Sequence, residues 1–394
     1  MKCKITNKSI KPFMSFGNMP IANGFLDKKD FSNEFFFNME VGFNEELSLF
    51  QLNDHPKPEK MFNKNYPFFT GSSEYMKRHF KSYAEFVKKY LKTNSRIIEI
   101  GSNDGTFLKN FDNSENFLTG VEPSKNVADI AIKNNIPTIN EFFNTVSAKK
   151  LKKFVGNTDL ICASNVICHV PNLNNLIEAV DLLLSKDGVF VFEEPYLGSM
   201  FEKVSYDQIY DEHIFMFSAT SISKIFSKFN FYLVDAIPQT THGGSMRYVL
   251  KRFKNEDNES LKKIFNYEDK NNLNKIDSCL EFKKNCEISK DNITNKIKSF
   301  KDEGRTICGY AATSKSTTIL NYCNIGTNYI DFICDTTKEK IGKFSPGKHI
   351  PIRDINYFHE NMTDCVYLFA WNHKEEIFNK EKNFRGEWFS HVNL

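Results

Sequence analysis

The stretch RIIEIGSNDGTFLKNF, residues 96–111, constrains the fold more than any other part of the sequence. Its apolar first half predicts a buried strand ending at Glu99, and the following polar residues predict a turn into a helix beginning near Thr106. Because Gly101 and Gly105 lack a Cβ, the backbone there can approach a ligand closely at the carboxyl end of the strand. This unit predicts an α/β domain that binds a ligand at its first loop.

The glycine spacing indicates which ligand. The pattern is E-x-G-x-x-x-G, typical of methyltransferases that use S-adenosylmethionine (SAM), and the G-x-G-x-x-G fingerprint of dinucleotide-binding oxidoreductases is absent. FLTGVEPS (117–124) predicts a second strand whose terminal acid can accept hydrogen bonds from the ribose hydroxyls of adenosine. An ordinary turn with a surface glutamate is the alternative. The predicted cofactor-binding residues here are Glu99, Gly101, Asn103, Asp104, Gly105 and Glu122.

Later apolar segments predict the rest of the sheet. TDLICASNVICHV (158–170) and DGVFVFEEP (187–195) read as the fourth and fifth strands, and FYLVDAIPQ followed by SMRYVLKR reads as a closing antiparallel pair. We therefore predict an α/β fold: a seven-stranded class I, Rossmann-like SAM-methyltransferase sheet with helices on both faces. Phe142, after the third strand, is expected near the adenine, although a core or surface role is the alternative. Asn165 is expected at the cofactor from the loop after the fourth strand.

The same patterns divide the chain into four regions. We predict an N-terminal lobe over residues 1–75, the methyltransferase domain over 76–254, a charged helical connector over 255–303, and a second, smaller α/β domain over 304–394.

Composition excludes several classes of partner. Lysine and arginine number 52 against 49 acidic residues, so no nucleic-acid partner is expected. We expect no signal peptide and no membrane span, because no apolar run is long enough, and the nine scattered cysteines favour reduced thiols. A cytoplasmic protein is the expectation. The sequence does not predict the oligomeric state.

Nine segments together resemble one family, the sugar C-methyltransferases that act on nucleotide-linked keto sugars, as in the tetronitrose and mycarose pathways. The resemblance spans nearly the whole chain. It implies a SAM-dependent C-methyltransferase that removes a proton beside the ketone of a nucleotide-linked keto-deoxysugar, whose enolate then attacks the SAM methyl. The segments are YPFFTGSSEYMKRHF (66–80), EIGSNDGTFL (99–108), GVEPS (120–124), SNVICHVP (164–171), QIYDEHIFMFS (208–218), THGGSMR (241–247), GYAATSKSTTILNYCNIG (309–326), SPGKHIPI (345–352) and FAWNHKEEI (369–377).

The resemblance implies that the sugar lies among Tyr66, His169, Tyr210, Glu212 and His213, with His213 as the base. If residues 208–215 are helical, Tyr210 and His213 share one face, and Glu212 can orient the imidazole. Imidazole titrates near neutrality, which suits a general base. A solvated, charged helix is the alternative for this segment, and a core position is the alternative for His169.

Two further segments are expected to contact the anionic part of the substrate. THGGSMR offers His242 and Arg247, and its alternative is a plain hairpin turn with the arginine in solvent. GYAATSKSTT predicts a helix start at which Ser314 and Lys315 suit a pyrophosphate. The resemblance implies that the C-terminal domain closes over the nucleotide. A purely structural α/β domain is the alternative.

The N-terminal lobe departs from the family pattern. Relatives carry a zinc lobe with two C-x-x-C pairs, whereas here Cys3 stands with Thr6, and VGFNEELSLFQL (41–52) has no cysteine. Structural zinc needs four ligands. We therefore predict no metal, zinc included, and a lobe held by apolar side chains: Phe35, Phe36, Phe37, Leu47, Leu49 and Phe50.

Two other functions remain open. A SAM-dependent O- or N-methyltransferase acting on a related sugar would use the same base on a hydroxyl or amine. A nucleotide-sugar binding protein without activity should have lost Glu122 or His213, and both are present.

Overall fold

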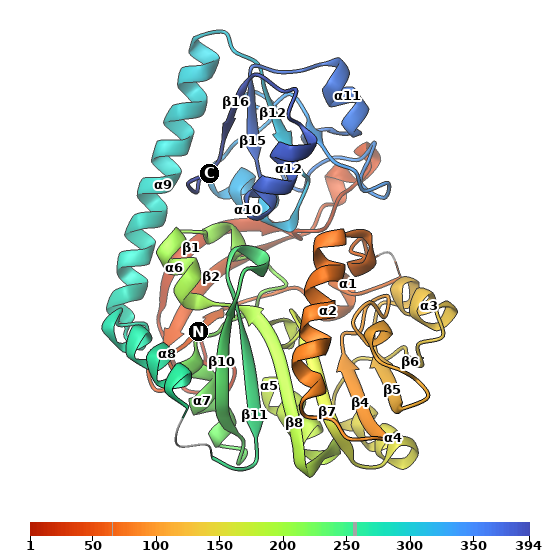
Figure 1. Cartoon of the computed structure of the whole chain (residues 1–394). Coiled ribbons are helices and arrows are strands. Elements are labelled where there is room, and N and C mark those ends of the chain that lie inside the picture. The colour runs from red at the N-terminus through yellow and green to blue at the C-terminus, as the bar shows by residue number, and fades with distance from the viewer. Residues whose placement is uncertain (65, 255–257) are drawn as a thin grey trace.

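The computed structural model describes residues 1–64, 66–254 and 258–394. The first three residues of the predicted connector, 255–257, therefore lie outside the described residues. Within the described residues there are three β-sheets, in the N-terminal lobe, the centre and the C-terminal part of the chain (Figure 1).

The central sheet confirms the predicted methyltransferase fold. Its order is β10-β11-β8-β7-β4-β5-β6. The strands from β8 to β6 run parallel, and β11 and β10 close the sheet as an antiparallel hairpin. The strands are β4 (Ser95–Ile100), β5 (Asn116–Val121), β6 (Thr138–Ile139), β7 (Thr158–Ser164), β8 (Leu184–Pro195), β10 (Tyr232–Gln239) and β11 (Ser245–Lys251).

Helices bury both faces of this sheet, as alternation along β4 requires. Ile97 packs against one face, with α2 and α3, while Ile98 and Ile100 pack on the other, with α4, α5 and α7. The helices are α2 (Glu74–Lys88), α3 (Lys125–Lys133), α4 (Thr145–Val155), α5 (Leu173–Leu183) and α7 (Ala219–Ser227). Helix α6 (Leu197–Lys203) packs instead in the core shared by the N-terminal lobe and the C-terminal part.

The helix expected from Thr106 is wrong. Only a short 3-10 helix, η3 (Leu108–Asn110), follows the glycine loop. The loop contains positive φ angles at Asn103 (48°) and Gly105 (78°), and the Thr106 hydroxyl donates to Asp104 Oδ1 at 2.6 Å. Such local side-chain bonds compete with helix formation. The glycine loop therefore forms turns, not a helix, at the carboxyl end of β4.

The N-terminal lobe is built on a four-stranded antiparallel sheet of order β1-β2-β3-β9. Its last strand, β9 (Phe215–Met216), comes from far along the chain, directly after the segment that contains His213. The expectation for Phe35 and Phe36 is wrong, because they are 40% and 43% exposed; the other four predicted core residues are buried. The other elements of the lobe are β1 (Pro12–Pro20), η1 (Lys28–Asn33), β2 (Phe36–Asn44), β3 (Leu49–Leu52), α1 (Pro58–Met61) and η2 (Thr70–Ser72).

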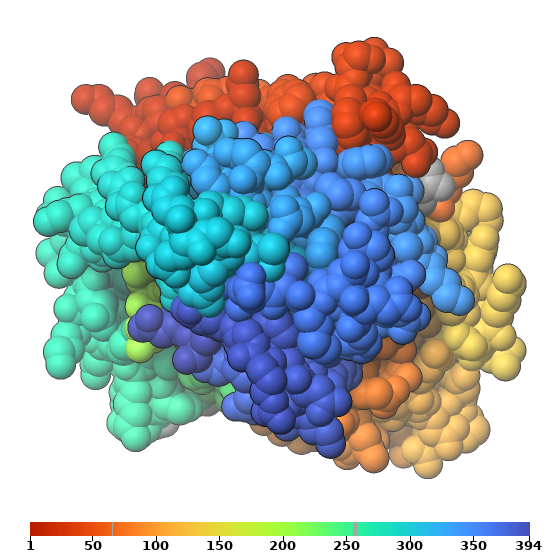
Figure 2. Space-filling view, turned by 90° about the horizontal axis from the view of Figure 1, so that it is seen from above, coloured from red at the N-terminus to blue at the C-terminus, as the bar shows by residue number. Residues whose placement is uncertain are grey.

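Two connector helices, α8 (Glu259–Lys270) and α9 (Ile276–Asp302), lead to a five-stranded parallel sheet of order β14-β13-β12-β15-β16. Seen from above, this C-terminal part (blue) lies between the N-terminal lobe (red), the connector and the outer helices of the central domain (Figure 2). Its elements are β12 (Ile307–Tyr310), α10 (Ser314–Tyr322), β13 (Ile333–Cys334), β14 (Ile352–Arg353), α11 (Ile355–Glu360), β15 (Cys365–Leu368), α12 (Lys374–Lys380) and β16 (Glu387–Phe389).

Short 3-10 helices occur where the chain turns around the site described below: η4 (Ile167–His169), η5 (Tyr206–Gln208), η6 (Thr241–Gly243) and η7 (Trp371–His373). All nine cysteines are buried free thiols. Among the described helices, none is long and apolar enough to cross a membrane.

Candidate active site

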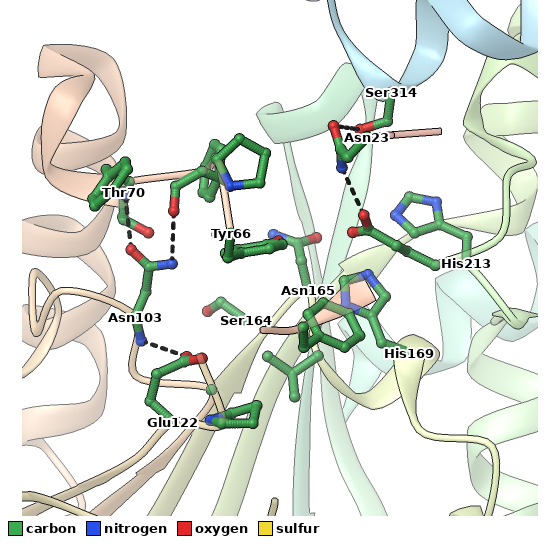
Figure 3. A pocket seen from close by; sticks show the side chains of 18 of the residues that line it. Asn23, Tyr66, Thr70, Asn103, Glu122, Ser164, Asn165, His169, His213 and Ser314 are labelled. Carbon is green, nitrogen blue, oxygen red and sulfur yellow. Dashed lines mark hydrogen bonds between the residues drawn. The ribbon is translucent and has the colours of Figure 1, made fainter. Parts of the chain in front are cut away.

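One cavity of about 1010 Å³ lies where the three regions meet, against the carboxyl ends of the central parallel strands. It is lined by most of the residues predicted from the sequence: Tyr66, Gly101, Asn103, Glu122, Phe142, Asn165, His169, Tyr210, Glu212, His213, His242, Ser314 and Lys315. Four predicted residues are not part of its lining: Glu99, Asp104, Gly105 and Arg247. In Figure 3 the ring of Tyr66 lies between the Asn103–Glu122 side of the cavity and the His213 side.

Glu122 is held rigidly at the end of β5. Its two carboxylate oxygens accept hydrogen bonds from the backbone N–H groups of Asn103 (3.0 Å) and Ser124 (2.7 Å). A carboxylate offers about four lone-pair sites, so about two remain for a ligand. Burial raises the pKa of this carboxyl, and the two backbone N–H groups oppose that shift. Gly101 leaves β4 with φ 68°, and a Cβ there would lie 2.3 Å from Val166.

The predicted residues outside the lining shape the loop. Asp104 accepts the backbone N–H of Gly71 at 2.7 Å and so fixes the segment before α2. Asn103 bonds the same segment, accepting from Thr70 N at 3.0 Å. Glu99 is buried beneath the loop, and burial, with Asp104 and Glu122 nearby, raises its pKa well above the ordinary value.

The segment around His213 is a turn, so the expected helix is wrong. After η5, the backbone N–H of His213 donates to Tyr210 O at 2.9 Å, and the chain then enters β9. The turn still brings the two rings together, with centroids 4.0 Å apart. His213 Nδ1 lies 2.7 Å from the carbonyl oxygen of Gln208, which can only accept. Nδ1 therefore carries the proton, and Nε2 accepts from the Tyr210 hydroxyl at 2.7 Å.

Both histidines at this end of the cavity are neutral. Burial, reinforced by His169, lowers the pKa of His213 well below its ordinary value. Burial also lowers the pKa of His169 to about 3. The two rings stack at 5.3 Å, and Phe62 covers the other face of His169 at 5.5 Å. His169 Nε2 has no hydrogen-bond partner within the described part of the chain, and it is available to a ligand.

Glu212 does not orient the imidazole, contrary to expectation. That role falls to the Gln208 carbonyl, while Glu212 accepts a 2.6 Å hydrogen bond from Asn23. Burial, and then the neighbouring Asp211, raise the pKa of Glu212, so this pair of carboxyls retains a proton to higher pH than free ones. Asn23 also accepts from the Ser314 hydroxyl at 3.2 Å. Sequence reasoning missed Asn23, whose Asn-Gly pair signals only a turn.

His242 and Arg247 have different surroundings. His242 lines the cavity, where its Nε2 lies 2.9 Å from Asn165 Nδ2. Arg247 points away, because strand β11 alternates its side chains between two faces. Its buried guanidinium pairs with Glu193 at 2.6 Å and lies 4.4 Å from the Tyr83 ring centroid. Arg247 thus neither contacts the cavity nor points to solvent.

The glycine pair of THGGSMR makes room for a protein side chain. A Cβ on Gly243 would lie 2.1 Å from the indole of Trp371, which comes from the C-terminal domain. The Trp371 Nε1–H donates to Asp207 at 2.7 Å. The glycine at position 243 therefore allows a close approach between the central domain and the C-terminal domain.

Lys315 places a positive charge on the cavity wall that the C-terminal domain forms. Its side chain is only 8% exposed, and Nζ donates to the His242 carbonyl at 3.1 Å. Burial lowers the pKa of Lys315, and Asp207 opposes that shift. An ammonium has three donors. Besides His242 it reaches Asn372 Oδ1 at 3.4 Å, which leaves donor capacity toward the cavity.

The metal-ligating groups do not form a structural zinc site in the lobe. Residues 3–62 contain only Cys3 and His55 as thiol or imidazole ligands, short of the four needed. Within the described ranges, the donor atoms that come together are those of Cys168, His169 and His213, within 4.8 Å of one another. His169 and His213 line the cavity, whereas Cys168 is buried outside its lining, and burial raises the Cys168 pKa well above its ordinary value.

Comparisons with known proteins agree with this architecture. A family model described as "Methyltransferase domain" matches residues 73–236, and one described as "C-methyltransferase C-terminal domain" matches 240–392. A third, described as "Putative zinc binding domain", matches residues 3–62. The strand order, the glycine loop and these matches define the chain as a class I SAM-dependent methyltransferase.

One curated relative indicates which kind of methyltransferase the chain resembles. The C-methyltransferase NovU of Streptomyces niveus is 27% identical over 377 residues, covering 94% of this chain and 89% of that protein. Together with the C-terminal family model, this similarity confirms the resemblance to C-methyltransferases that the sequence implies.

Two solved structures align with less than half of the chain. A SAM-dependent methyltransferase from Anabaena variabilis is 19% identical and covers 43% of this chain and 84% of its own, with a TM-score of 0.35. The magnesium protoporphyrin IX methyltransferase from Synechocystis PCC 6803 with bound SAH is 13% identical and covers 45% and 83%, with a TM-score of 0.36.

Proposed function

We propose that this C-methyltransferase methylates the carbon beside the ketone of a nucleotide-linked keto-deoxysugar. The observation that carries the proposal is the state of His213: a neutral ring with its proton fixed on Nδ1 by Gln208 and its Nε2 facing a tyrosine hydroxyl in the cavity. A neutral imidazole with an available nitrogen is a competent general base.

The SAM end of the cavity is the glycine loop. Glu122 retains about two acceptor sites for the ribose hydroxyls of the cofactor, and Gly101 permits close approach of the backbone. Ser164 ends the neighbouring strand β7, and Asn165 follows it. Ser164 Oγ and Asn165 Oδ1 have no partner within the described ranges and can bond the cofactor. When bound there, SAM supplies an electrophilic methyl group.

The base acts at the other end. On binding, the substrate ketone oxygen takes the hydrogen bond of Tyr210, which frees His213 Nε2. The C–H bond beside the ketone then breaks, its proton goes to Nε2, and its electron pair forms the enolate, whose oxygen Tyr210 stabilises. The enolate carbon would then bond to the methyl group of SAM while the bond from that methyl to the sulfonium sulfur breaks, so that S-adenosylhomocysteine leaves with the electron pair. Tyr66, His169 and Glu212 complete the wall around the sugar.

The nucleotide end is the C-terminal domain. Ser314 and Lys315 lie at the start of α10 on the cavity wall, where a buried ammonium and the helix start favour a diphosphate. Asn23 joins this wall to Glu212 by two hydrogen bonds. A sugar at His213 and its diphosphate at Lys315 then occupy one continuous space.

The test is incubation of the purified chain with SAM and a panel of dTDP-, GDP- and CDP-linked 4-keto sugars. Mass spectrometry should show the gain of one methyl on at least one sugar, and NMR should place it on carbon. A methyl ether or methylamine product would replace the proposal with the O- or N-methyltransferase reading, and no transfer to any keto sugar would overturn it.

A further inference from the structure

The C-terminal domain repeats the cofactor-binding half of the central sheet. In chain order, the central strands β4 to β8 lie as β6-β5-β4-β7-β8, and the C-terminal strands lie as β14-β13-β12-β15-β16. Both sets are parallel, with the first strand in the middle and the second and third on one side of it, and Figure 1 shows this order for the central set. This is the order of a mononucleotide-binding half, whose ligand lies at the carboxyl ends of the strands.

The first residue after the first strand has a similar positive φ angle and an equivalent backbone hydrogen bond in both units. Gly101 leaves β4 with φ 68° and donates to Val121 O at 2.7 Å. Ala311 leaves β12 with φ 72° and donates to Cys334 O at 2.8 Å. A positive φ is unusual for alanine and is retained where the surroundings enforce it.

The acid at the end of the second strand is also repeated. Asp335 follows β13 as Glu122 follows β5. Its carboxylate accepts from Ala312 N in the first loop and from Thr337 N two residues on, both at 2.7 Å. Glu122 likewise accepts from Asn103 N in its first loop and from Ser124 N two residues on. Each carboxylate therefore has about two lone-pair sites left.

The third strand completes the match. The backbone N–H of Glu122 donates to Ile139 O of β6 at 3.0 Å, and that of Asp335 donates to Arg353 O of β14 at 2.9 Å. Both acids are buried, at 5% and 8% exposure, and both line the same cavity. The cavity is thus bounded by the carboxyl ends of two similar units.

We propose that Asp335 binds the pentose hydroxyls of the substrate's nucleoside, as the equivalent acid Glu122 is placed to bind those of SAM. This inference rests on the proposed function and names the residue that recognises the nucleoside. The Lys340 ammonium, 3.9 Å from Asp335 and bonded to Ala312 O at 2.7 Å, lies beside the carboxylate on the same cavity wall. The ligand class is a nucleoside diphosphate with at least one free pentose hydroxyl.

The test compares nucleoside diphosphates with their 2′,3′-dideoxy counterparts. Calorimetry with the full chain, SAH present, uses dTDP, GDP and CDP against the matching dideoxy diphosphates. For the nucleotide that binds best, loss of the pentose hydroxyls should weaken binding about 10-fold or more, as for a lost hydrogen bond to a charged group. In Asp335→Asn this gap should shrink to about 3-fold or less, while SAM affinity stays at the wild-type value.

Glu122→Gln is the matched control, because it should weaken SAM and leave the hydroxyl gap unchanged. Equal affinities within every pair, no binding of any diphosphate, or a full gap in Asp335→Asn would each overturn the inference. The wild-type comparison needs no variant, so it holds even if Asp335→Asn folds poorly. A gap without methyl transfer to any keto sugar would retain the nucleoside site and reject the proposed reaction instead.

Discussion

The hydroxyl of Tyr210 lies 2.7 Å from Nε2 of His213, on the side of the ring opposite the Gln208 carbonyl. The two contacts fix both the orientation and the tautomer of the imidazole without any carboxylate. A base held in this way keeps its lone pair directed at one point in the cavity.

His213→Ala should lower kcat about 10²–10⁴-fold, the usual contribution of general acid–base catalysis. SAM affinity should stay near wild type, because the glycine loop and Glu122 are untouched. Steady-state kinetics and calorimetry measure both. His359→Ala is the matched control: this half-exposed histidine pairs with Glu381, outside the cavity lining. A His213 variant with wild-type turnover would mean that the turn is only structural.

Proton removal can also be observed without methyl transfer. In deuterated buffer with SAM omitted, wild type should exchange deuterium into the carbon beside the ketone, and His213→Ala should not. NMR of the recovered sugar follows the exchange. Equal exchange by both proteins would assign the base to another residue.

Tyr210→Phe should reduce kcat less than His213→Ala, by about 10-fold, the value of one hydrogen bond. The phenol donates to the ketone or enolate oxygen, and other donors at the wall can replace part of that interaction. The variant also leaves Nε2 permanently unbonded. A loss as large as that of His213→Ala would instead make Tyr210 part of the proton-transfer step itself.

Glu122→Ala should weaken SAM binding by about 1–3 kcal/mol, the range for hydrogen bonds to a charged group. Some of this loss comes from the loop, because Asn103 and Ser124 lose their acceptor. The exposed Glu115, just before the opposite end of β5, provides the control as Glu115→Ala. Unchanged affinity in calorimetry would remove Glu122 from the cofactor site.

The pH dependence of kcat/KM should not show the loss of activity near pH 6.5 that protonation of an ordinary histidine base would cause. A base works deprotonated, and burial lowers the pKa of His213 well below its ordinary value. The group therefore stays active as the pH falls through about 6.5, where a free imidazole would already be half protonated. We expect kcat/KM to stay level from about pH 8 through that point. An acid limb with its midpoint near pH 6.5 would show either that the pKa of His213 is not lowered or that His213 is not the base.

The purified, untagged protein should contain far less than one zinc per chain by elemental analysis. The N-terminal lobe offers Cys3 and His55 where four ligands are needed. EDTA should accordingly leave the Tm unchanged, since the buried side chains of the lobe hold it together. Near-stoichiometric zinc, or a Tm that falls with EDTA, would contradict this. A variant with Cys168→Ser should be analysed in parallel to exclude metal held by the cavity histidines.

Local patterns predicted the parts of the site that local geometry determines. Gly101 and Glu122 lie at the ends of neighbouring parallel strands, so spacing alone brings them together. Asn23 could not be found in this way. It contacts Glu212 across 189 residues and Ser314 across 291, and only the packed fold creates those contacts. Gln208 acts through its carbonyl, which every residue has, so its identity carried no signal.

Arg247 was misplaced for a related reason. Its spacing from His242 suggested a common ligand, but the face of β11 to which it points depends on strand register. The helix expected over residues 208–215, which would place Tyr210 and His213 on one face, does not form because β9 draws the chain into the N-terminal sheet. A tertiary contact thus overrode a local preference.

The pairing of β9 with β3 has a consequence for how this enzyme can be divided. The chain leaves the methyltransferase domain to add two residues, Phe215 and Met216, to the sheet of the lobe, and it does so immediately after His213. The lobe is therefore not a detachable module. Removing the lobe, or exchanging it with that of a relative, would leave His213 on an unanchored loop. Chimeras should therefore be joined at sites that keep β3 and β9 from the same parent protein.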